Sequence, residues 1–213
     1  MLYLFFTYFG YLVLIINFIL YTKGFFKFGK AFKIYVFYLF LLVIVQLTME
    51  ILTSFSINNL YLIHLYFIGQ FILLGIFYKT LLQDTFQKNI ITFSLFFGSL
   101  LLAIQYIYEP DVFFKFNLFE IVLTSLLVVV FALLYLYKML TDSKKYYYIT
   151  VGIIIYLLAS TVLFLVGNLT IGLSKEVRLI SWNLNAFFVA VNQLFVLYEW
   201  KVSFQKKNFA EWQ

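Results

Sequence analysis

Two carboxylates and one imidazole are the residues of this sequence best suited to binding or proton chemistry. Glu50 and Glu120 lie inside long apolar stretches, and His64 is the single histidine of the chain. Ionisable side chains are costly in lipid, and those that occur there commonly mark a functional site. Together the three residues could bind a cation, bind an amine-bearing ligand, or share a proton whose position depends on pH.

Amide and indole side chains accompany these three residues. The full set of candidate ligand-binding residues is Glu50, His64, Gln70, Gln105, Glu120, Asn168, Trp182, Asn183 and Asn185. Judged by their depth along the apolar stretches, they fall in the outer half of the expected helix bundle, which favours an outward-facing polar pocket over a channel. The structural alternative is that the ionisable groups reach interfacial water from helix ends, while the amides only join helices.

The composition decides what kind of protein positions these residues. Of the 213 residues, 65% are hydrophobic and 11% are charged, whereas soluble domains have about 25% charged residues. Seven apolar runs are each long enough to cross a hydrocarbon core of about 30 Å. They are Leu2–Tyr21, Ile34–Phe55, Leu60–Leu82, Ile90–Tyr108, Leu118–Leu140, Tyr147–Val166 and Leu179–Trp200. We therefore expect an all-α integral membrane protein, a single domain of seven transmembrane helices over residues 1–200.

The distribution of basic residues predicts the orientation. Twelve of the fifteen Lys and Arg residues follow the first, third, fifth or seventh run, and only Lys115, Lys175 and Arg178 lie on the other side. By the positive-inside rule, the amino terminus is expected outside and the carboxyl terminus in the cytoplasm, with residues 201–213 as a short interfacial tail.

The last apolar run, Leu179–Trp200, is expected to be a central helix. Amides in lipid must turn toward other helices or a wet cavity. Asn185, Asn192 and Glu199 recur at intervals of seven and fall near one stripe of a helix. Ala186 and Ala190 form a small-xxx-small pair on its flank, which lets a neighbouring backbone approach closely.

Several function classes are excluded by what the chain lacks. The last run contains no lysine for a retinal Schiff base, and one histidine cannot supply a multi-histidine zinc site. With no cysteine and no recognisable catalytic constellation, an enzyme is the less favoured class, and no cofactor is indicated. A mixed metal site of His64 with Glu50 and Glu120 stays open, because imidazole and carboxylate together suit zinc, manganese or iron.

At the level of topology, the chain resembles the membrane module of bacterial seven-helix receptors, and no specific motif carries that resemblance. It departs from them in lacking an output domain after Lys201, so the resemblance implies a sensory or ligand-binding protein that signals to a separate cytoplasmic partner. The basic segment Lys23–Lys33 and the tail Lys201–Gln213 could contact that partner or lie against anionic lipid, the first as an interfacial helix or as a loop.

The lysine-rich bias suggests a bacterial inner-membrane protein surrounded by lipid, and basic residues placed beside membrane spans are a poor indicator of nucleic-acid binding. The first alternative to a sensor is a structural or accessory subunit of a larger membrane complex. A lipid-modifying membrane enzyme ranks below it.

Overall fold

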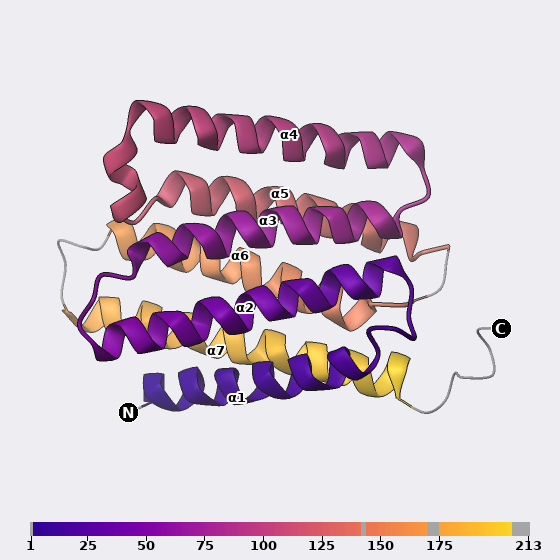
Figure 1. The fold of residues 1–213 in the computed structure, drawn as a ribbon, viewed down its shortest axis with the longest axis horizontal. Helices are drawn as coiled ribbons and strands as arrows, with labels where there is room; N and C mark the ends of the chain where they lie inside the picture. The colour runs from indigo at the N-terminus through magenta and orange to yellow at the C-terminus, as the bar shows by residue number, and fades with distance from the viewer. Residues whose placement is uncertain (1, 142–143, 170–174, 206–213) are drawn as a thin grey trace. The chain divides into compact units, whose positions relative to one another are not determined.

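The computed structural model describes residues 2–141, 144–169 and 175–205, and these are helical, with no strand among them (Figure 1). The long helices are α1 (Leu2–Lys23), α2 (Lys30–Ser54), α3 (Leu60–Leu81), α4 (Thr85–Tyr108), α5 (Leu118–Lys138), α6 (Tyr147–Leu169) and α7 (Lys175–Glu199). A 3-10 helix η1 (Pro110–Phe114) follows α4, and a π-helical turn η2 (Trp200–Phe204) follows α7. Each long helix coincides with one predicted apolar run, so that prediction is confirmed.

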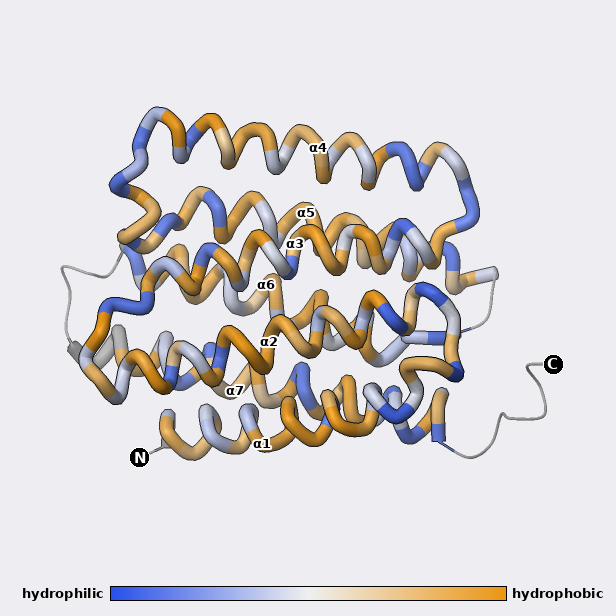
Figure 2. The backbone as a smooth tube through the Cα atoms, in the orientation of Figure 1, coloured by the Kyte–Doolittle hydropathy of each residue, from blue (hydrophilic) through white to orange (hydrophobic). Residues whose placement is uncertain are grey.

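All seven long helices are long and apolar enough to cross a membrane. Figure 2 shows apolar residues along the helices and hydrophilic residues mainly at their ends and in the turns between them. Several helices continue beyond their apolar runs: α2 begins at Lys30, α4 at Thr85 and α7 at Lys175. Backbone hydrogen bonding can continue into polar sequence, so an apolar run marks the span better than the helix end.

The segment between α1 and α2 is a series of turns. Hydrogen bonds from Gly24 N–H to Tyr21 O and from Lys27 N–H to Gly24 O close these turns, and α2 begins only at Lys30. Phe26, which lies within these turns, is 90% exposed. Of the two alternatives for this segment, the loop is confirmed and the interfacial helix is wrong.

The chain divides into two compact units, Phe28–Tyr135 and Met1–Lys27 with Leu136–Gln213. The prediction that residues 1–200 form a single domain stays a prediction, and tail residues 206–213 lie outside the described part of the chain.

In the unit Phe28–Tyr135, helix α3 packs against several neighbours. It contacts α2, where the Tyr38 hydroxyl donates a hydrogen bond to Gln70 Oε1 over 3.0 Å. It contacts α5 through the stacked rings of Phe71 and Phe131. It also packs against α4 and η1. Polar side chains at the ends of α3, α4 and α5 can therefore meet.

In the other unit, α7 contacts both α1 and α6. On the α1 side, Asn17 Nδ2 donates to the backbone oxygen of Gln193 over 2.8 Å and to its Oε1 over 3.0 Å. Gly10 lies against the Cα of Ala190, which is the close backbone approach expected beside the alanine pair. Helix α7 is thus central to this unit, as its amides predict.

The stripe of Asn185, Asn192 and Glu199 on α7 faces α6. Asn185 accepts a hydrogen bond from Ser160, and Gly152 lies against Asn192. Glu199 accepts hydrogen bonds from the backbone at the start of α6. The prediction that these polar residues turn toward another helix is confirmed.

Candidate functional site

His64, Tyr106 and Glu120 meet at one end of the unit Phe28–Tyr135, and we call them the triad. His64 lies in the second turn of α3, Tyr106 in the last turn of α4 and Glu120 in the first turn of α5. His64 Nδ1 is 3.1 Å from Glu120 Oε2 and 2.8 Å from the Tyr106 hydroxyl, which donates to the same carboxylate oxygen. Three successive helices thus bring an imidazole, a carboxylate and a phenol into one hydrogen-bonded group.

An ionised Glu120 would determine which nitrogen of a neutral His64 carries the proton. The single proton of the Tyr106 hydroxyl goes to Glu120, so this oxygen faces His64 as an acceptor. An ionised Glu120 also offers only acceptors. With Glu120 ionised, Nδ1 of His64 must therefore be protonated, and Nε2 of a neutral imidazole then holds a lone pair.

Two acceptor atoms of the triad lack a donor. His64 is 1% exposed and Glu120 is 0% exposed. Within this buried group, Nε2 of His64 and Oε1 of Glu120 have no hydrogen-bond partner. A buried polar atom without a partner costs roughly 1–3 kcal/mol, a cost that a ligand supplying a donor would remove.

Asn117 allows the Glu120 side chain to face the triad. A glutamate at the third position of a helix often folds back to cap the helix start. Here Asn117 makes the usual N-cap bond, in which its Oδ1 accepts from the Glu120 backbone N–H over 3.2 Å, and the Glu120 carboxylate accepts from Tyr106 instead of folding back. Asn117 Nδ2 also donates to Gln105 Oε1 over 3.0 Å, which joins the end of α4 to the start of α5.

Phe113 of η1 covers the imidazole. Its ring stacks on His64 with centroids 5.5 Å apart and an interplanar angle of 24°. The same ring meets Tyr106 edge-on at 6.1 Å. Phe113 itself is 42% exposed, so one aromatic layer separates part of His64 from the surroundings.

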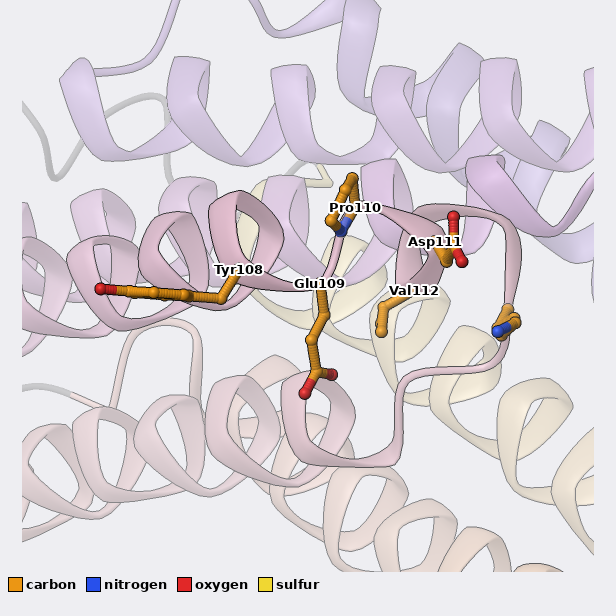
Figure 3. Close-up of a pocket in the computed structure, with 6 residues that line it drawn as sticks. Tyr108, Glu109, Pro110, Asp111 and Val112 are labelled. Atoms are coloured by element: carbon orange, nitrogen blue, oxygen red, sulfur yellow. The ribbon is translucent and has the colours of Figure 1, made fainter.

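A hollow of about 370 Å³ lies beside this turn and is lined by Tyr108, Glu109, Pro110, Asp111, Val112 and Lys115. In Figure 3 the carboxylates of Glu109 and Asp111 point away from each other. They do not converge as cation ligands, and we assign the hollow no site.

The other predicted site residues of this unit are not members of the triad. Gln105 reaches it through Asn117. Gln70 is buried and pairs with Tyr38. Glu50 is exposed on α2. Among the described residues, no group of three or more His, Cys, Asp or Glu side chains could hold a metal ion. The mixed metal site of His64 with Glu50 and Glu120 is therefore not formed.

The remaining four predicted residues belong to the other unit. Asn168 is exposed on α6, and Trp182 is 56% exposed and meets Tyr3 edge-on at 6.5 Å. Asn185 is bonded to Ser160 over 2.7 Å, and Oδ1 of Asn183 is buried without a partner. That these residues bind a ligand stays a prediction.

Sequence reasoning did not single out Tyr106, Phe113 or Asn117. Asn117 had a readable signal, since an asparagine three positions before a glutamate at the start of an apolar run is typical of a helix cap. With 18 tyrosines and 29 phenylalanines in the chain, the type of residue alone could not mark Tyr106 or Phe113.

A second buried carboxylate, Glu199, lies near the basic loop that precedes α6. Its oxygens accept from the backbone N–H groups of Tyr146 and Tyr148, each over 2.8 Å, and from the Ser203 hydroxyl. Burial lowers the pKa of Lys145 in this loop, and the negative charge of Glu199 opposes that shift. The bonds of Glu199 are those of a structural helix cap.

No protein-family model, curated protein or solved structure matches this chain, so its function has to be inferred from the triad and its surroundings.

Proposed function

We propose that this protein is a multi-pass sensor of the bacterial inner membrane that binds its stimulus at the triad of His64, Tyr106 and Glu120. In topology it resembles the membrane module of bacterial seven-helix receptors. The observation that carries the proposal is the pair of buried acceptors without donors, Nε2 of His64 and Oε1 of Glu120.

Electrostatics support a binding role over simple helix packing. With Glu120 ionised and His64 neutral, the triad carries one negative charge at 0% exposure. An isolated buried charge is strongly disfavoured, and the hydrogen bonds from Tyr106 and His64 reach only one of the two carboxylate oxygens. A stimulus that brings positive charge or a hydrogen-bond donor would stabilise this group. A sensor requires such a difference in free energy between its bound and unbound states.

The distribution of lysines supports an outward-facing triad. In its unit, the described lysines Lys30, Lys33, Lys79 and Lys88 lie at the start of α2, the end of α3 and the start of α4, which is the end opposite the triad. Only Lys115 lies on the triad's side of this unit. By the positive-inside rule, the triad then faces outward and the lysines face the cytoplasm.

Cysteine labelling tests this orientation without background, because the chain has no cysteine. Lys115→Cys and Lys144→Cys are both at exposed positions. In intact inner-membrane spheroplasts, a membrane-impermeant maleimide is expected to label the first variant and to leave the second unlabelled until the membrane is opened. Labelling of Lys144→Cys in intact cells would contradict the orientation.

The accessory-subunit alternative has one observation in its favour. Glu50 is an exposed carboxylate on the apolar helix α2, a position that a foreign helix could cover.

Mild-detergent purification of the tagged protein from its own membrane, followed by mass spectrometry, separates the two functions. A sensor is expected to carry a cytoplasmic signalling protein in less than equal amount. A membrane protein retained one-to-one would make the chain a subunit and contradict the sensor.

A further inference from the structure

We propose that the group taken up by the triad is a proton, accepted at Nε2 of His64, and that Phe113 is the lid that controls its access. This inference rests on the proposed sensory function and specifies the stimulus. It is drawn from the burial of the triad, from its hydrogen bonding and from the stacking of Phe113.

Burial limits what can reach the triad. His64 and Glu120 are 1% and 0% exposed, so the closed site offers almost no surface that an organic ligand could contact. A proton needs no cavity and can arrive through a single water. Imidazole is also the side chain that changes charge most readily between about pH 5 and 8.

The hydrogen bonds determine where the proton goes. Nδ1 of His64 already donates toward Glu120 and Tyr106, which leaves Nε2 as the free acceptor. A proton passed from water to Nε2 forms an imidazolium and leaves the donating water as hydroxide or, from hydronium, as water. The added proton changes the net charge of the triad from −1 to zero. The imidazolium then lies 3.1 Å from ionised Glu120.

The charged groups around His64 come from each element packed on α3. Tyr106 on α4 and Glu120 on α5 contact the imidazole directly. The turn that contains η1 adds Glu109, Asp111 and Lys115, all exposed, and α2 adds exposed Glu50. The exposed groups are screened by water and ions, which leaves the buried Glu120 as the main unscreened charge beside His64.

Phe113 covers one face of the imidazole. A stacked aromatic ring interacts more favourably with a cation than with a neutral ring. Phe113 lies in the short helix η1 and is 42% exposed, so a change of its side-chain rotamer would uncover the imidazole. Opening of this ring would admit water to Nε2, and closing would hold the proton in place.

The single histidine makes a direct test possible in the full-length protein, reconstituted in lipid nanodiscs. With ¹⁵N-histidine labelling, the only imidazole signals are those of His64. We expect these signals to move reversibly from a neutral Nδ1–H tautomer to the imidazolium as the pH is lowered. A His64 signal that stays in one protonation state throughout would overturn the proposal.

Access is measured in the same samples by the rate at which diethyl pyrocarbonate acylates His64, located by mass spectrometry. Phe113→Ala is expected to raise this rate about tenfold or more, because reagent access follows the population of the open form. Phe113→Leu, which keeps an apolar cover, should give a smaller increase and guards against a folding defect. Phe114→Ala is the matched control, because Phe114 contacts Phe113 but has no ring contact with His64.

Equal rates in Phe113→Ala and the wild type would overturn the lid. These outcomes are separable from the fate of the sensor itself. If Glu120→Gln abolishes signalling while His64 never titrates, the sensory function stands and the proton is the wrong stimulus. If His64 takes up a proton and Glu120→Gln leaves signalling intact, the triad binds a proton but is not the sensory site, and the proposed function is wrong.

Discussion

Replacing Glu199 by alanine is expected to lower the free energy of unfolding by roughly 3 kcal/mol, because the change removes the acceptor for one buried and two part-buried donors. Each buried donor left unsatisfied costs about 1–3 kcal/mol before the structure relaxes. The donors are the backbone N–H groups of Tyr146 and Tyr148 and the hydroxyl of Ser203. Glu199 itself is 0% exposed, so water cannot easily replace it.

The place of Glu199 explains why the effect should be large. Its carboxylate lies at the start of α6, where the exposed N–H groups of a helix favour negative charge. It also holds Tyr146, whose φ of 61° lies in the left-handed region that is unfavourable for a bulky side chain. Around it, Lys145 Nζ lies 5.6 Å from the Tyr146 ring and 5.8 Å from the Phe204 ring. Loss of the carboxylate would loosen α6, α7 and η2 together.

The measurement is denaturant unfolding of the purified variant in detergent micelles, followed by near-ultraviolet circular dichroism. Glu199→Gln is the matched variant, since it retains one oxygen acceptor and should lose less than half as much stability. Ser203→Ala removes a single donor and should cost about 1 kcal/mol or less. An unfolding transition of Glu199→Ala equal to that of the wild type would show that these bonds are not important for stability.

The number and positions of the helices could be predicted because each apolar run is long enough to be a helix by itself. The central place of α7 in its unit was also predictable, since a stripe of Asn185, Asn192 and Glu199 must turn away from lipid. Which helix it meets was not predictable. That depends on contacts such as Gly152, where an added Cβ would lie 2.8 Å from Phe195 Cβ and 2.9 Å from Asn192 Oδ1.

The triad was predictable in part. Counting residues along each run gives the depth of a side chain, and depth correctly placed His64, Gln105 and Glu120 at the same end of their unit. The rotation of each helix about its axis is set by packing, which the weak amphipathicity of such apolar helices does not reveal. This is why Glu50, of similar expected depth, lies on an exposed face, and why Gln70 pairs with Tyr38.

If stimulus binding at the triad controls a cellular response, Glu120→Gln should abolish that response. The substitution preserves shape but removes the charge and places an amide against Tyr106 and His64. Glu50→Gln makes the same chemical change at an exposed carboxylate, so it is the matched control. Both variants are introduced at the native locus, and their membrane abundance is checked against the wild type.

The measurement compares the transcript profiles of the two variants with those of the wild type and a deletion strain. We expect Glu120→Gln to reproduce the profile of the deletion and Glu50→Gln to reproduce that of the wild type. A Glu120→Gln strain that matches the wild type, while the deletion does not, would contradict the claim that the triad is the sensory site.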